Sequence, residues 1–203
     1  MKLKQSFYER PDVVKIAREL LGKGLFTRIN GVVTGGIIVE TEAYSWKERG
    51  CHAYLSRKTD RNAIMFEPGG NSYVYLCYGM HHLFNVVTNK RGVAEAVLIR
   101  ALEPTDGLKE MELRRGSSVK GYHLTSGPGK LTKALGIDRK LNAKSLLKNE
   151  VWIEDMKSDF PDSRIVASPR IGIDYAGEDA LLPWRFSVRE NKWVSRQNIR
   201  QEN

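Results

Sequence analysis

Two long β-rich segments joined by a two-residue turn limit the fold of this chain more than any other feature. Residues 25–29 and 32–42 flank Asn30-Gly31, a dipeptide that favours the type I′ turn of a β-hairpin because both residues tolerate positive φ. Further strand-like segments follow, separated mainly by turn residues. Strands are expected over residues 72–78, 83–88, 94–102, 151–153, 170–173 and 185–188. Because the strands cluster rather than alternate with helices, the sequence predicts an α+β fold.

Short helices are expected to flank the sheet, over residues 13–21, 108–115 and 130–135. In the first helix, apolar residues recur at helical spacing after Asp12 and stop before Gly22. Pro128 precedes the last helix, where a missing backbone N–H costs nothing in the first turn. The 203 residues contain no repeat, low-complexity tract or long linker, so we expect a single domain over residues 1–203.

The charge of the chain points to an anionic partner. There are 33 Lys and Arg residues against 24 Asp and Glu residues, a net charge of +9, which attracts nucleic acid or an anionic membrane surface. A basic face that meets only solvent explains the charge alone equally well. The apolar runs, such as residues 96–99, are too short to span a membrane, and no signal peptide is visible. Because Cys51 and Cys77 are the only cysteines, we expect no disulfide framework and a location in the reducing cytoplasm.

Glu40 and Glu42 are the first candidates for chemistry. Side chains alternate along a strand, so these two carboxylates are expected to share one face, roughly 7 Å apart. Such a pair can supply a general base, but charged pairs on the solvent-facing side of a strand are common. His52 lies beyond Glu42 in a polar loop over residues 47–62. It is either a site residue or a loop histidine whose hydrogen bonds are satisfied.

Several common reactions lack the motifs that they need. The sequence contains no Walker A loop, no Gly-x-Gly-x-x-Gly fingerprint and no Gly-x-Ser-x-Gly elbow. His81-His82 has no cysteine or carboxylate at metal-ligand spacing, so no metal site is expected. The segment over residues 127–130 either binds phosphate through backbone N–H groups or forms only a turn and a helix start.

Tyr78 stands next to Gly79, at the reversal between two expected strands. Aromatic residues in strands usually belong to the core. At the tip of a hairpin in a basic protein, however, a large apolar side chain has the placement used to wedge between stacked bases. Tyr78 is therefore a candidate for contact with nucleic acid.

Seven groups of residues resemble the alkyladenine (3-methyladenine) DNA glycosylase family and occur in the order found there. They are ARELLGK at 17–23, IVETEAY at 38–44, His52 with TDRN at 59–62 and MF at 65–66, YVYLCYGM at 73–80, NVV at 85–87, VLIRALEP at 97–104 and SGPGKL at 126–131. The resemblance extends from about Ala17 to the region of Trp193, which is nearly the whole chain.

The resemblance implies one domain with a curved antiparallel sheet, flanking helices and a β-hairpin that protrudes into the DNA minor groove. It implies a monomeric, monofunctional glycosylase that flips alkylated purines, and deaminated purines as a further class, out of double-stranded DNA. Hydrolysis then leaves an abasic site for base excision repair. No metal, cofactor or membrane is implied.

The resemblance also assigns roles to residues. Glu42 would activate water, held by Arg100 and the backbone of Ile171. The base pocket would be lined by Tyr44, His52, Tyr75 and Asn85, with Asn85 excluding a purine 2-amino group. The DNA contacts would come from Tyr78 in the vacated space, Gly79 and Met80 beside it, and Lys130, with Arg57, Lys58 and Lys133 on flanking phosphates.

Two other functions fit parts of the sequence. A module that binds distorted nucleic acid without catalysis would use the same basic residues. A carbohydrate hydrolase would use Glu40 and Glu42 across a scissile bond, but it would explain neither the aromatic hairpin tip nor the net charge.

Overall fold

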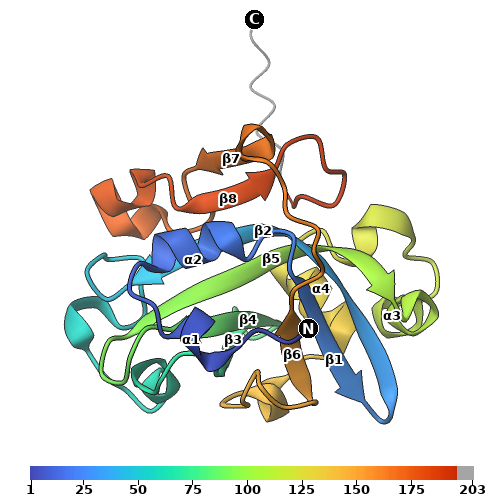
Figure 1. Cartoon of the computed structure of the whole chain (residues 1–203), viewed down its shortest axis with the longest axis horizontal. Helices are drawn as coiled ribbons and strands as arrows, with labels where there is room; N and C mark the ends of the chain where they lie inside the picture. The colour runs from blue at the N-terminus through green and yellow to red at the C-terminus, as the bar shows by residue number, and fades with distance from the viewer. Residues whose placement is uncertain (196–203) are drawn as a thin grey trace, which may run out of the picture.

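The computed structural model describes residues 1–195, so residues 196–203 of the predicted domain lie outside the described part. Its centre is one antiparallel sheet of eight strands with the order β3-β4-β5-β2-β1-β6, in which β8 pairs with β2 and β7 with β8 (Figure 1). The strands are β1 (Gly24–Ile29), β2 (Val32–Ser45), β3 (Ser72–Cys77), β4 (His81–Thr88), β5 (Glu95–Asp106), β6 (Val151–Glu154), β7 (Ile165–Ser168) and β8 (Arg185–Val188). The predicted α+β fold with an antiparallel sheet is confirmed.

Strand β2 has 14 residues and two successive partners on one edge. Its first half pairs with β1 through the predicted turn, in which Asn30 has φ of 50° and Gly31 has φ of 81°. Its second half pairs with β8 over residues 40–42, while β5 pairs along nearly its whole length. The register of β2 against β5 shifts on both sides of Glu40. The sheet is thus irregular where β2 exchanges β1 for β8.

The three expected helices are present within two residues of their predicted bounds. The α-helices are α1 (Gln5–Tyr8), α2 (Val13–Glu19), α3 (Leu108–Arg115) and α4 (Pro128–Leu135). The 3₁₀ turns are η1 (Tyr54–Ser56), η2 (Ala63–Phe66), η3 (Gly121–Leu124), η4 (Arg139–Leu141), η5 (Asp162–Arg164) and η6 (Asp174–Leu181). Asp12 caps α2 by accepting a hydrogen bond from the N–H of Lys15. Helix α1 and the 3₁₀ turns η1 to η5 have only three or four residues, too few to show apolar periodicity in the sequence. The eight-residue η6 is interrupted at Gly177, whose φ is 61°.

The strand expected over residues 170–173 is wrong. That segment is a loop after β7, and Gly172 has φ of 78°, outside the range of a strand. The segment serves other purposes, because Arg170 is buried in an ion pair and Ile173 is buried as well.

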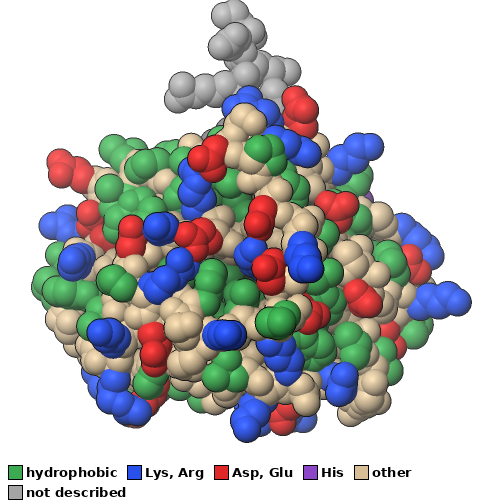
Figure 2. All heavy atoms as spheres, in the orientation of Figure 1, with side chains coloured by type: hydrophobic (Ala, Val, Ile, Leu, Met, Phe, Trp, Pro, Cys, Tyr) green, Lys and Arg blue, Asp and Glu red, His purple; other side chains and the backbone are tan. Residues whose placement is uncertain are grey.

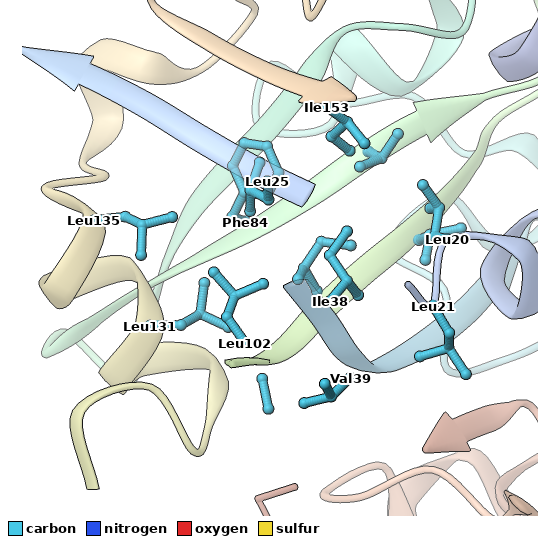
Figure 3. Packing of buried hydrophobic residues seen from close by; sticks show 14 of the residues in the cluster. Leu20, Leu21, Leu25, Ile38, Val39, Phe84, Leu102, Leu131, Leu135 and Ile153 are labelled. Carbon is cyan, nitrogen blue, oxygen red and sulfur yellow. The ribbon is translucent and has the colours of Figure 1, made fainter. Parts of the chain in front are cut away.

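The two faces of the sheet are used differently. One face packs against α2 and α4, where strand residues such as Ile38 and Leu102 meet Leu20, which follows α2, and Leu131 of α4 (Figure 3). Each such buried side chain contributes roughly 1.5–3 kcal/mol of transfer free energy. The opposite face carries a smaller cluster around Met65 and leaves room for polar side chains.

Charges are mixed on the surface shown in Figure 2, where Lys and Arg side chains alternate with Asp and Glu. The positive excess is therefore not gathered on this face. Within residues 1–195, no helix combines the length and apolar character that crossing a membrane requires.

Candidate active site

The register of the sheet brings residues from five strands into one row, and four of these residues are polar. Tyr73 pairs with Asn85, Asn85 with Leu98, Leu98 with Glu42, and Glu42 with Arg185. Residues paired directly across antiparallel strands project from the same face. Side chains that are up to 143 positions apart in the sequence, from residue 42 to residue 185, are thereby aligned on the face away from α2.

Arg100 is placed by a bulge in β5. Glu40 pairs with Ala101 and Thr41 with Ile99, so Arg100 is an extra residue between two successive pairs. A bulge of this kind redirects a side chain. The guanidinium of Arg100 reaches both carboxylates, with Nε 2.9 Å from Oε1 of Glu40 and Nη1 3.2 Å from Oε2 of Glu42.

Glu42 is fully buried and held by three donors. Its Oε2 accepts from Arg100 and, at 2.8 Å, from the hydroxyl of Tyr44. Its Oε1 accepts from the backbone N–H of Ile171 at 2.8 Å. An ionised carboxylate oxygen can accept about two hydrogen bonds, so Oε1 keeps capacity for one more donor. The alternative of a solvent-facing pair is wrong for both Glu40 and Glu42, since neither has exposed surface.

Glu40 has a different environment from Glu42. It is bound by Arg100, by Nε of Arg185 at 2.7 Å and by the backbone N–H of Ser195 at 2.7 Å. Burial alone would raise the pKa of Glu40, but the charges of Arg100 and Arg185 outweigh burial and lower it. Glu40 is therefore an ionised anchor for two arginines, and it does not reach the cavity described next.

A cavity of about 910 Å³ adjoins this cluster. Small-molecule pockets commonly have roughly 300–1,000 Å³, so a purine base fits. The predicted site residues that line it are Tyr44, His52, Tyr75, Tyr78, Met80, Asn85, Arg100, Lys130 and Ile171. Glu42 and Gly79 are not lining residues. Glu42 lies directly behind three of them, Tyr44, Arg100 and Ile171, because it is hydrogen-bonded to each.

Aromatic rings form part of the cavity wall. The rings of His52 and Tyr75 are 4.7 Å apart in an edge-to-face arrangement. Nδ1 of His52 is 2.8 Å from the hydroxyl of Tyr73. His52 is open to the cavity, yet the protein around its ring removes enough water to lower its pKa to about 4, helped by the positive charge of Arg61. His52 is thus neutral at physiological pH.

Tyr44 has its hydroxyl fixed on Glu42. Burial, and after it the negative charge of Glu42, raises the pKa of Tyr44 well above its usual value. The phenol therefore stays protonated and remains a donor. Its ring faces the guanidinium of Arg170 at 4.8 Å.

The β3–β4 hairpin carries an exposed aromatic tip. Tyr78 is 83% exposed and Met80 is 72% exposed. Tyr78 and Gly79 have φ of 50° and 68°, so the strand alternation ends there and Tyr78 reaches the same cavity as Tyr75. The hairpin stands on α4, where the hydroxyl of Thr132 donates to the carbonyl of His82 at 2.7 Å.

Comparison with known proteins decides which family has this site. The model of the methylpurine-DNA glycosylase family matches residues 6–192. This chain belongs to that family. The resemblance stated from the sequence is confirmed, and the chain is a DNA glycosylase.

Curated relatives cover almost the whole length of this glycosylase. A protein of Chlamydia felis is 47% identical over 94% of this chain and 97% of its own, and one of Chlamydia abortus is 48% identical over 91% and 96%. A protein of Bacillus cereus is 44% identical over 97% of this chain and all of its own. Each bears the name "Putative 3-methyladenine DNA glycosylase".

Positive side chains line the cavity of the glycosylase without an acidic partner among residues 1–195. They are Arg61, Arg115, Lys130 and Lys133. Lys130 and Lys133 belong to α4, which begins at the cavity after Gly127. Arg57 and Lys58 are exposed on the neighbouring loop and do not line the cavity, so their contact with phosphates stays a prediction.

One buried ion pair of the glycosylase, between Arg170 and Glu48, was not expected from its sequence. Arg170 forms two 2.8 Å hydrogen bonds to the carboxylate of Glu48 and one of 2.9 Å to the carbonyl of Ala43. The pair ties the end of β2, which carries Tyr44, to the loop that carries Ile171. The sequence offered one signal, which is the presence of Arg170 in a segment expected to be a strand. An arginine is rarely buried without a partner.

Metal-binding geometry is not found in the described part of the glycosylase. No three or more His, Cys, Asp or Glu side chains within residues 1–195 come together as ligands would. Cys51 and Cys77 are both free thiols.

Proposed function

We propose that this glycosylase acts as a monofunctional hydrolase in which Glu42 activates water against the sugar carbon of a flipped purine nucleotide. The observation that carries the proposal is the position of Glu42, buried directly behind a purine-sized cavity and hydrogen-bonded to three of its lining residues. We propose further that it works as a monomer in the cytoplasm on double-stranded DNA with alkylated purines.

Access to the base requires that it leave the helix. A base inside a duplex cannot be reached, and flipping it out costs a few kcal/mol, least for a damaged or mispaired base. Tyr78 and Met80, exposed at the hairpin tip, would fill the vacated space and offset part of that cost. Lys130 and Lys133 beside the cavity would hold flanking phosphates, which positions the duplex without reading its sequence.

The reaction uses the buried cluster. Water within reach of Glu42, Arg100 and the backbone of Ile171 would bond through its oxygen to C1′ of the nucleotide. The N-glycosidic bond breaks, its electron pair leaves with the purine, and the proton of the water passes to Glu42. The positive charge that develops on the sugar is stabilised by the carboxylate. An N-alkylated purine is cationic before the reaction, so it departs as a neutral base.

Selection among bases would come from the cavity wall. The flipped base would stack against Tyr44 on one side and Tyr75 with His52 on the other. Asn85, which is buried and lines the cavity, would face the edge of the purine that carries the 2-amino group of guanine. The hydroxyl of Tyr73 fixes one nitrogen of the His52 ring, so the ring presents a set orientation to the base.

The test is a comparison of the wild type with Glu42→Gln on duplexes that contain 3-methyladenine. Wild type should release the free base and leave an abasic strand that breaks only after alkali treatment. Glu42→Gln should release base about 10²–10⁴ times more slowly and bind the duplex with unchanged affinity. Release by Glu42→Gln at the wild-type rate would reject Glu42 as the base. Strand breakage without alkali would reject the monofunctional reaction.

A further inference from the structure

Both aromatic walls of the cavity already face a guanidinium. The carbon at the centre of the Arg170 guanidinium is 4.8 Å from the ring centre of Tyr44, and that of Arg61 is 4.8 Å from the ring centre of Tyr75. Cations are attracted to aromatic faces. A cationic purine that enters this cavity therefore meets rings that already interact with positive charge.

The two arginines differ in how their charge is balanced. Arg170 is buried and its charge is matched by the two hydrogen bonds to Glu48. Arg61 is exposed, lines the cavity and forms no ion pair with an acidic side chain in residues 1–195. The charge of Arg61 acts on three residues of the cavity wall. It favours the uncharged ring of His52 and the ionised forms of Tyr73 and Tyr75.

We infer that Arg61 sets the preference of the pocket between cationic and neutral damaged purines, by placing an uncompensated positive charge on the wall where the base stacks. This inference rests on the proposed function. A cationic N-alkylpurine is repelled by the guanidinium on Tyr75, whereas a neutral base such as hypoxanthine is not. Arg61 thus reduces the advantage that cationic lesions derive from their weaker glycosidic bond, and it keeps neutral lesions competitive.

Arg61 differs from Lys133 because its charge lies against an aromatic ring of the cavity wall. Lys133 lines the same cavity from α4, but no aromatic ring lies beneath its charge among the described contacts. Its removal should weaken binding of any duplex to the same degree, because a phosphate contact carries no information about the base. Lys133→Gln is therefore the matched control for the loss of one positive charge.

The experiment measures single-turnover release of 3-methyladenine, which is cationic within DNA, and of hypoxanthine, which is neutral. Both bases are placed in the same duplex sequence, and the release rate of each is measured at a series of enzyme concentrations. The ratio of the two rates is then compared among variants. Arg61→Gln should raise the ratio of cationic to neutral release by about five- to tenfold, as expected for one partly screened charge at this range. Arg61→Lys, which keeps the charge, should stay within twofold of the wild-type ratio, and so should Lys133→Gln.

The outcomes separate the inference from the function on which it rests. An Arg61→Gln ratio equal to that of the wild type would overturn the inference alone, and so would an equal loss of both activities, which would make Arg61 a phosphate contact. Release of neither base by the wild type would overturn the proposed function and this inference with it. Because Arg61 is exposed, its replacement is expected to leave the fold unchanged.

Discussion

Nε of Arg100 donates to Oε1 of Glu40 at 2.9 Å, and both side chains are buried. The bond fixes the guanidinium that also holds Glu42. Glu40 is thus a positioning residue for the site, although it does not line the cavity. Its carboxylate also compensates Arg185, so its negative charge serves two buried arginines.

Replacement of Glu40 by Gln should cost about 3–5 kcal/mol of unfolding free energy at pH 7, because it removes the carboxylate that two buried arginines share. The pKa of Glu40 is lowered in the folded chain. Its stabilisation is therefore complete above the pKa of an unfolded glutamate and is lost as the pH falls through the lower folded pKa. Urea unfolding should show a smaller gap between wild type and Glu40→Gln at pH 3 than at pH 7. The exposed Glu178→Gln is the control, and a gap that does not change with pH would contradict this account.

Tyr78→Ala should leave stability within about 0.5 kcal/mol, since the side chain is largely exposed. Base release should fall about 5- to 150-fold, the equivalent of roughly 1–3 kcal/mol for one lost base–aromatic contact. A fluorescent adenine analogue next to the lesion reports flipping, and its signal should be lost in Tyr78→Ala but kept in Tyr78→Phe. A full signal from the alanine variant would remove the wedge role.

Gly129→Ala tests how the β3–β4 hairpin packs against α4. A Cβ at this position would lie 2.8 Å from Cγ of His81, too close for the present packing. The part of the hairpin next to its tip must then shift, at a cost of about 1–3 kcal/mol, and base release should fall with it. The double variant Gly129→Ala/His81→Ala restores the space and should recover activity. If activity falls equally in both variants, the contact is not the cause.

Titration of His52 by NMR should show a neutral ring down to about pH 5, because its pKa is lowered to about 4. The unfolded chain binds this proton near pH 6.5. The stability that comes from the neutral ring is therefore present above pH 6.5 and is lost as the pH falls toward 4. Arg61→Gln should raise the pKa of His52, since the Arg61 charge is one cause of the shift. An ordinary pKa in the wild type would contradict the described surroundings of the ring.

Local signals predicted local structure well. The turn at Asn30-Gly31 and the helix over residues 108–115 were placed correctly because a few neighbouring residues determine each of them. Helix α1, with four residues, has no periodicity to detect. Strand β7 was not predicted, and its pairing with β8 depends on residues 17 or more positions away.

The sequence motifs predicted which residues belong to the site, but not the contacts that these residues make. The resemblance gathered residues that the structure brings around one cavity, but their roles stay proposals. The burial of Glu40 could not be inferred from alternation along one strand, because it depends on Arg185 and Ser195, over 140 positions away. The same holds for Arg170, whose partner Glu48 is 122 positions distant.

The row that ends in Arg185 has a consequence for biosynthesis. Strand β8 leaves the ribosome after strands β1 to β7, and until it docks, the second half of β2 has an open edge. Prematurely terminated products that lack β8 hold Glu40 without Arg185, one of its two arginine partners. A nascent chain therefore completes the support of Arg100 only after residues 185–188 have been synthesised and have paired with β2.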